Sequence, residues 1–491
     1  MDINELQEKY NNTRDFISQK EYAKAIEIIN KVLDIIPNDI SFLLLKAYIY
    51  LDTHHLESAE AILKAMVKRS PNNADIHYQL GRLYLVQKQL DISLLHYEKA
   101  FVLDKTIDKQ LTFINVKRIA SKTREECEIT LNLLNQFISD HSKVWIAYFY
   151  RGLLLERLGL YDLALADFNK CLIHNPNHTD VLFSKAKLLL RKGNFREGFL
   201  LYEERKKLNH KAFKVNVTLP MWNGQDIQKD KLFVFAEQGL GDNIQFVRYA
   251  VMAKELGFNV VVGNFLPLEQ LLRYNLEKLG VKVIKNNIVD SDAQYQVSMC
   301  SLPYFLNATL SNIPLKKAYL TAEPEFITKW KNKFPFTNKF KIGLVWQGSL
   351  TNGRDTERSI PLEKLNSLLH LNAEFHCLQK VISQKDLAFI RQQHNFTAWH
   401  NEITDFSDTA ALIEHMDLVI SVDTSVAHLS AAMGKLTWIM ITHNPDFRWL
   451  LDREDSVWYE NVRLFRQDKN LEWDSVIKRI YSELINILSK K

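Results

Sequence analysis

Three polar turns, each directly after a run of apolar residues, carry the side chains that could do chemistry. The clearest turn follows the apolar run Leu418–Val422, reads Asp423-Thr424-Ser425, and leads into a small-residue stretch with His428. Such a run is typical of a parallel strand covered on both faces. Open α/β sheets bind phosphates where such a strand turns into a helix, because free N–H groups and the positive helix end face the ligand. The sequence therefore predicts an anion site at this turn.

The second turn follows the predicted strand Leu232–Ala236 and reads Glu237-Gln238-Gly239-Leu240-Gly241-Asp242 before a helical pattern starts at Ile244. Its two glycines allow a tight turn or a close approach to a ligand. They do not complete the dinucleotide fingerprint, which argues against a dehydrogenase. A carboxylate such as Asp242 can take the proton of an acceptor hydroxyl.

The third turn, Gln347-Gly348-Ser349, follows the predicted strand Lys341–Trp346 and opens a loop that ends at Ser359. Two arginines in a loop are usually solvated, but guanidinium groups can also hold a phosphate in a bidentate manner. A further strand, Phe375–Leu378, places two polar residues at its carboxyl end, where ligands bind in these sheets. The polar and basic candidates of this region are Gln347, Arg354, Arg358, Gln379 and Lys380.

The same residues also have a purely structural interpretation. Asp423 could cap the end of a buried strand while His428 packs inside the following helix. Asp242 could serve as a helix cap, a role that carboxylates fill well, and this is compatible with a chemical role.

Composition limits the class of protein. Lys and Arg number 63 against 58 Asp and Glu, a net charge of +5 in 491 residues, which does not point to nucleic acid. The four cysteines lack metal-ligand spacing and are predicted to be reduced, buried thiols. The start of the chain is polar, unlike a signal peptide, and no apolar run approaches the ~18 residues of a membrane helix. We therefore expect a cytoplasmic protein without a membrane span or a nucleic-acid partner.

The first 210 residues show a period of 34, for example between Pro37 and Pro71 and between Ala25 and Ala59. Such a period with small residues at fixed points is the signature of the tetratricopeptide repeat (TPR), a pair of helices. Five repeats are recognisable, and residues 105–144 form a degenerate one. The fold class expected for this part is an α-helical TPR solenoid, whose concave face suits a protein partner or a second copy of the chain.

Three segments, residues 234–249, 342–361 and 417–434, resemble heptosyltransferases of glycosyltransferase family 9. The resemblance implies a GT-B fold, with two Rossmann-like α/β domains facing a cleft. Residues 211–325 would form the acceptor side and residues 326–491 the nucleotide-sugar side, with the last helix, Leu471–Leu488, crossing back to the first domain. Ser425 stands where the family usually has glycine.

The resemblance also assigns roles. Asp242 is the implied general base. The residues implied to hold the diphosphate and ribose are Arg358, Lys380, Thr424, Ser425 and His428. The other implied substrate contacts are Gln238, Gly239, Gly241, Gln347, Arg354, Gln379 and Asp423.

We therefore expect an inverting glycosyltransferase that needs neither a metal nor a cofactor and uses a nucleotide-diphospho-sugar as co-substrate. The similarity extends to bacterial proteins that fuse TPR repeats to such a domain, so the repeats would position a protein or glycan acceptor. The alternative is an interaction scaffold whose GT-B domain is inactive. The nucleotide, the sugar and the oligomeric state stay open.

Overall fold

The computed structural model describes residues 2–208, 219–227, 230–286, 292–334, 337–349 and 355–490. The chain forms two compact units, Met1–Leu154 and Leu155–Lys491. In the described parts of the chain, none of the helices is long and apolar enough to cross a membrane.

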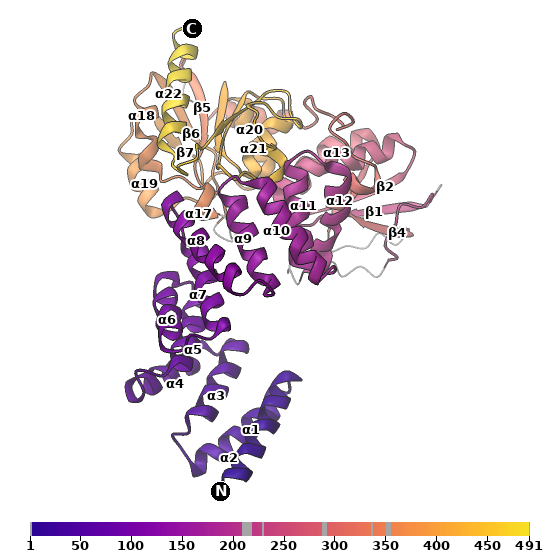
Figure 1. Ribbon diagram of the computed structural model, residues 1–491. Helices are drawn as coiled ribbons and strands as arrows, with labels where there is room; N and C mark the ends of the chain where they lie inside the picture. The colour runs from indigo at the N-terminus through magenta and orange to yellow at the C-terminus, as the bar shows by residue number, and fades with distance from the viewer. Residues whose placement is uncertain are drawn as a thin grey trace. The chain divides into compact units, whose positions relative to one another are not determined.

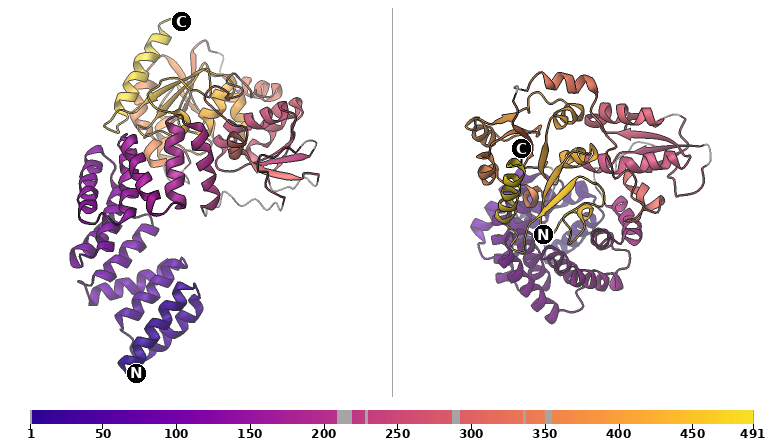
Figure 2. Two further views of the ribbon diagram at one scale, coloured as in Figure 1. Left: turned by 45° about the vertical axis from the view of Figure 1, so that its right-hand side comes forward. Right: turned by 90° about the horizontal axis from the view of Figure 1, so that it is seen from above.

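The first unit consists of successive pairs of antiparallel helices, as predicted (Figure 1 and Figure 2). The degenerate stretch 105–144 forms a helix pair like its neighbours. The helices are α1 (Ile3–Ser18), α2 (Tyr22–Ile35), α3 (Ile40–Asp52), α4 (Leu56–Arg69), α5 (Ala74–Val86), α6 (Leu90–Leu103), α7 (Ile107–Ala120), α8 (Arg124–Asp140) and most of α9 (Trp145–Arg157).

Small residues at the repeat positions let the two helices of a pair approach closely. At Gly81 on α5, an added Cβ would lie 2.8 Å from the ring of Tyr97 on α6. Ser93, also on α6, donates a hydrogen bond of 2.7 Å to the carbonyl of Gly81. The 34-residue period thus reflects a packing requirement of each helix pair.

The second unit begins with three further repeat helices, and residues of the last two share one hydrophobic core with the α/β part. Phe195 stacks on Trp458 with ring centres 5.5 Å apart, and Phe199 meets Phe246 edge to face at 6.5 Å. Each fully buried aromatic side chain contributes about 1.5–3 kcal/mol. The repeat segment that precedes residue 210 is therefore integral to this unit. The bounds of the three predicted domains stay predictions. These helices are α10 (Tyr161–His174), α11 (Thr179–Arg191) and α12 (Phe195–Tyr202), followed by the 3-10 turn η1 (Glu203–Lys207).

The α/β part of the second unit contains two parallel sheets. The first has the strand order β3-β2-β1-β4, and the second has the order β10-β9-β8-β5-β6-β7. Val234 pairs with Val262 in the first sheet, and Val345 with Ser421 in the second. The strands are β1 (Lys231–Phe235), β2 (Asn259–Asn264), β3 (Lys282–Lys285), β4 (Tyr295–Ser298), β5 (Phe340–Val345), β6 (Ala373–Cys377), β7 (Phe396–Ala398), β8 (Leu418–Val422), β9 (Thr437–Ile441) and β10 (Val462–Arg466).

Helices cover both sheets, and the strand order of the second sheet reverses between β5 and β8. Ligands of open parallel sheets bind beyond the carboxyl ends of the strands at such a switch point. The longer helices are α13 (Leu240–Glu255), α14 (Glu269–Leu276), α16 (Pro324–Lys331), α19 (Gln384–Arg391), α20 (Phe406–Glu414), α21 (Ser425–Ala432) and α22 (Asp474–Leu488), and the short ones are α15 (Leu302–Phe305), α17 (Asp355–Arg358) and α18 (Asn366–Leu369).

The last helix does not cross back to the first sheet, so that prediction is wrong. Helix α22 lies beside the second sheet (Figure 1), where Val476, Ile480 and Leu484 enter the core formed with Phe465 and Trp438. The apolar residues of α22 repeat at helical spacing and pack in this core. This packing explains why the helix stays with the second sheet.

Candidate functional site

The first corner, Glu237–Asp242, joins β1 to α13. Gln238 has a left-handed backbone with φ of 60°, which a residue other than glycine seldom adopts. The side-chain amide of Asn243 holds the turn by donating to the carbonyls of Glu237 and Gly239, at 3.0 and 2.7 Å. Buried side-chain hydrogen bonds therefore keep this corner in its sharp conformation.

Asp242 caps helix α13, as the structural interpretation of this residue predicts. Its carboxylate accepts the N–H of Gly239 at 2.8 Å. The same carboxylate accepts a charged hydrogen bond from Arg448. Asp242 is thus ion-paired at the start of α13, and its predicted role as general base stays a prediction.

The second corner, Asp423–Ser425, joins β8 to α21 with the bounds expected from the apolar run. Thr424 is the N-cap: its hydroxyl accepts the N–H of Ala427 at 3.4 Å and lies 3.0 Å from the hydroxyl of Ser421. The eight-residue helix α21 then starts with its N–H groups directed at the corner. Its positive end favours an anion there.

The two corners lie against each other because α13 packs on α21. At Gly241, an added Cβ would lie 2.9 Å from the ring of His428 and 3.3 Å from the Cα of Ser425. The predicted close approach at this glycine is therefore made to the second corner. A larger residue at this position would push the two helix starts apart.

Arg448 joins the first corner to the loop after β9. Besides Asp242, its buried guanidinium donates to Asp446 at 2.5 Å, and it lies over the ring of Phe447 at 4.4 Å. Neighbouring carboxylates raise the pKa of Arg448 well above its ordinary value, although burial opposes this. The cation is therefore a permanent part of the site.

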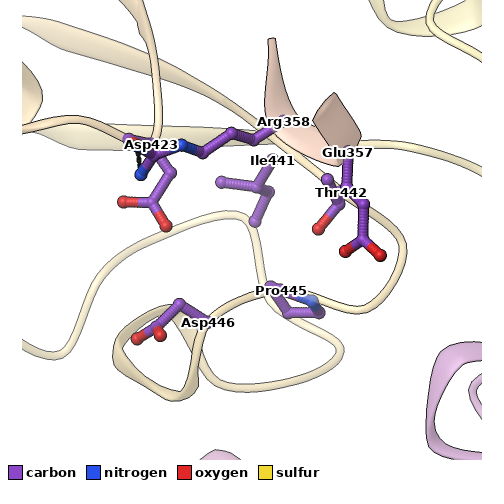
Figure 3. A pocket seen from close by; sticks show the side chains of 7 residues that line it. All are labelled: Glu357, Arg358, Asp423, Ile441, Thr442, Pro445 and Asp446. Carbon is purple, nitrogen blue, oxygen red and sulfur yellow. Dashed lines mark hydrogen bonds between the residues drawn. The ribbon is translucent and has the colours of Figure 1, made fainter. Parts of the chain in front are cut away.

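A small pocket of about 70 Å³ opens at the carboxyl ends of β8 and β9 (Figure 3). Carboxylates of three acidic residues and one guanidinium group face it. The lining residues are Glu357, Arg358, Asp423, Ile441, Thr442, Pro445 and Asp446.

Arg358 lies in the pocket wall, and its predicted contact with phosphate stays a prediction. Its Nη1 donates to the backbone carbonyl of Asp423 at 2.7 Å, and its Nε donates to Asp355 at 3.2 Å (Figure 3). These two contacts hold the guanidinium beside the second corner. Its remaining N–H groups can then be offered to an anion in the pocket.

The pKa of the Asp423 carboxyl group in the pocket is raised above its ordinary value. Burial raises its pKa to about 6, and the nearby Asp446 carboxylate adds to the rise, while Arg358 and Arg448 oppose it. Near neutral pH this group is therefore close to its titration point, so that a proton can neutralise one of the pocket's negative charges.

His428 supports the second corner as a neutral side chain. Burial, together with the nearby Arg448 cation, lowers its pKa to about 3. Its ring stacks on Trp449 at 5.1 Å, and its Nδ1 lies 2.9 Å from the hydroxyl of Tyr459. The other nitrogen, Nε2, lies 3.9 Å from the Asp423 carboxylate. His428 is therefore packed inside the protein and also lies beside the pocket.

Other predicted contacts lie away from this pocket. The Gln379 side chain is buried and accepts the N–H groups of Trp346 and Gln347, at 2.8 and 3.1 Å. Lys380 is exposed and donates to the carbonyl of Ile403. Their predicted substrate roles stay predictions, as do those of Gln347 and Gly239. Arg354 lies outside the described residues.

The sequence reasoning did not single out Asp446, Arg448 or Glu357, although all three help to form the site. The first two belong to a polar run that follows β9, the same signal that identified the other turns. Ligands of parallel sheets bind at the carboxyl ends of the strands, so the polar residues after every strand are candidates, and these would have included Asp446 and Arg448.

Comparisons with known proteins agree with this arrangement. A profile of glycosyltransferase family 9 (heptosyltransferase) matches residues 402–438, which include β8, the second corner and α21. Tetratricopeptide repeat profiles match residues 16–71, 44–102 and 145–178. The chain joins TPR repeats to a segment similar to family 9.

Among curated proteins, the chain is 25% identical over 367 residues to protein FlbA of Caulobacter vibrioides, which covers 69% of this chain and 61% of FlbA. The chain thus spans less than two thirds of that relative. A TPR protein from Parabacteroides merdae matches with 17% identity and a TM-score of 0.36, over 41% of this chain and 78% of that one. A TPR protein from Thermus thermophilus matches with 19% identity and a TM-score of 0.32, over 38% and 98%.

Proposed function

We propose that the second unit is an inverting, metal-independent glycosyltransferase of the GT-B architecture that uses a nucleotide-diphospho-sugar. The observation that carries the proposal is the pocket beside the second corner, which Arg358 and Asp423 line. Helix α21 begins two residues after Asp423. The corner belongs to the segment similar to family 9.

In this proposal the donor's diphosphate lies in the pocket. Arg358 and the N–H groups of α21 stabilise its charge, and this stabilisation grows as the sugar leaves. Protonation of Asp423 reduces the repulsion between the phosphates and the pocket's carboxylates. Thr424, Ser425 and His428 shape the corner against which the donor binds.

The acceptor hydroxyl oxygen attacks the anomeric carbon from the face opposite the diphosphate. The new glycosidic bond forms as the bond between the anomeric carbon and the phosphate oxygen breaks, and the nucleoside diphosphate departs. Asp242 on the first corner takes the hydroxyl proton. The close packing of the two corners supports this role, because Gly241, the residue before Asp242, lies against the second corner.

A thermal-shift screen of the full chain with ADP, UDP, GDP and their sugars tests donor binding. A ligand at 100 times its dissociation constant stabilises the protein by about 2.7 kcal/mol, which such an assay detects. The proposal expects one nucleoside diphosphate to stabilise the protein more than its monophosphate. If every nucleotide leaves the unfolding temperature unchanged at millimolar concentration, the proposal is wrong.

A second candidate function is donor binding without transfer. The ion pair between Asp242 and Arg448 favours it, because the Arg448 guanidinium already occupies an oxygen of the carboxylate that would have to reach the acceptor hydroxyl. The two candidates differ in one measurement, the release of free sugar or glycosylated product from the donor found in the screen.

We assign acceptor positioning to the repeats. Arg82 on α5 lies 4.5 Å over the ring of Tyr48 on α3 and 3.7 Å from Asp52. An aromatic, acidic and basic surface that spans neighbouring repeats suits a polypeptide more than a bare sugar. Arg82→Ala should therefore reduce transfer to a protein acceptor and leave donor binding unchanged; equal losses in both would contradict the assignment.

A further inference from the structure

Arg205 is a fully buried cation at the end of the last repeat helix. It belongs to η1, directly after α12. Its Nε and Nη2 donate to one oxygen of Glu237 at 2.9 and 2.5 Å. Its remaining donors reach Glu203, Ser301 and the carbonyl of Tyr202, at 2.7, 2.7 and 3.1 Å. The guanidinium is thus held on all sides by the second unit.

Glu237 is equally buried and is the first residue of the first corner. The hydroxyl of Ser298, at the end of β4, donates to the same carboxylate. Directly after Glu237 comes Gln238 with its left-handed backbone, and the carbonyl of Glu237 accepts from Asn243. A shift of Glu237 would therefore be passed to the turn that carries Asp242.

The first corner is thus held between two arginines from different parts of the chain. Arg205 holds its beginning through Glu237, and Arg448 holds its end through Asp242. A buried carboxylate that loses its cation becomes an uncompensated charge and must protonate or move toward water. Movement of Glu237 would release the strained backbone at Gln238.

We propose that Arg205 is a positioning residue, which acts through Glu237 to hold the first corner in the conformation that presents Asp242. The end of the repeat array then helps to position a residue of the transfer site. The inference rests on the proposed function for the role of Asp242, but the hold on the corner can be measured without any reaction.

The chain supplies a matched control. Arg191 and Glu156 form another buried ion pair, with a distance of 2.8 Å, between α11 and α9 of the same unit. The hydrogen bond of this pair joins two repeat helices and involves no residue of the first corner. Arg191→Met therefore removes a buried cation of the same kind without touching the corner.

The test compares the full-length wild type, Arg205→Met, Arg205→Lys and Arg191→Met by hydrogen–deuterium exchange with mass spectrometry. Arg205→Met should speed exchange in residues 237–243 by about tenfold or more, and Arg191→Met should leave that segment unchanged. Arg205→Lys keeps the charge with fewer contacts and should give an intermediate rate; it also serves if the Met variant fails to fold. Wild-type protection of residues 237–243 in both Arg205 variants would overturn the proposal.

A second readout separates positioning from general weakening. With the donor found in the screen, Arg205→Lys should lower kcat while donor affinity stays within about twofold, because the pocket lies on the second corner. An unchanged kcat would overturn the positioning role. If no donor binds the wild type while the corner still loosens in the Arg205 variants, the proposed function fails and the hold on the corner stands.

Discussion

The two corners have the same design, a buried parallel strand that turns into a helix, but their charges are treated differently. In the first corner, Glu237 and Asp242 are both paired with arginines of the protein itself. In the second, the Asp423 carboxyl group faces a pocket that a ligand can enter, and Arg358 is bound to a backbone carbonyl. The protein's own cations thus fix the shape of one corner, whereas the other keeps charge available for binding.

Removing Arg448 should have the largest effect, because its guanidinium joins the first corner to the loop after β9. Arg448→Met leaves the carboxylates of Asp242 and Asp446 without their cation, and we expect the free energy of unfolding to fall by about 3–5 kcal/mol. Urea denaturation measures this loss. In the control Arg453→Met, which breaks an exposed pair with Asp455, the loss should be only about 0–1 kcal/mol. Equal losses in both would contradict a buried junction.

Changing Asp242 tests whether the fixed corner also does chemistry. Asp242→Asn retains an oxygen for the N–H of Gly239, so helix capping should survive. We expect the transfer rate to fall by ~100-fold or more while nucleotide affinity is nearly unchanged. Initial rates with the donor from the screen measure this. A normal rate would show that Asp242 is only a cap and an ion-pair partner.

Changing Arg358 tests the open corner. Arg358→Ala should weaken binding of the nucleoside diphosphate by roughly 1.5–3 kcal/mol, the range for hydrogen bonds to charged groups. The monophosphate should lose less, because it lacks the second charged group. Isothermal titration calorimetry with both ligands measures the difference. Equal losses for the two would place Arg358 away from the diphosphate.

The smallest expected effect is that of pH on nucleotide binding at the second corner. The pKa of Asp423 is raised to about 6, so the group is neutral below this pH and negative above it. Affinity for a nucleoside diphosphate should therefore rise by up to about tenfold between pH 7.5 and 5.5, a change equivalent to ~1.4 kcal/mol. Asp423→Asn removes the titrating group but leaves the ligand's own protonation unchanged. Identical pH profiles for the two proteins would show that Asp423 does not cause the pH dependence of nucleotide affinity.

The sequence predicted the parts of the site that depend on local pattern. Leu418–Val422 is a buried strand because both its faces are covered, and the polar residues that follow it must lie at the carboxyl edge of the sheet. The helix pairs of the repeats followed from the 34-residue period in the same way.

The remaining parts depend on contacts between distant segments. Gln379 lies at a strand end, as ligand contacts do, but its side chain accepts backbone N–H groups of the neighbouring strand end. The pairing of Arg448 with Asp242 spans 206 residues, and no local pattern encodes such a pair. Helix α22 was misplaced because periodicity identifies an apolar face but not the surface that it covers.

The repeats of the first unit each pack on their neighbours, whereas α11 and α12 share the core of the second unit. An array of this kind behaves like a string of interchangeable modules, whose stability is approximately a sum over adjacent links. Whole repeats could be added to or deleted from Met1–Leu154 without altering the core that α11 and α12 share with the first corner's unit. Repeat number is therefore a dimension along which such a chain can change its reach in evolution, or be re-engineered, while its chemistry stays constant.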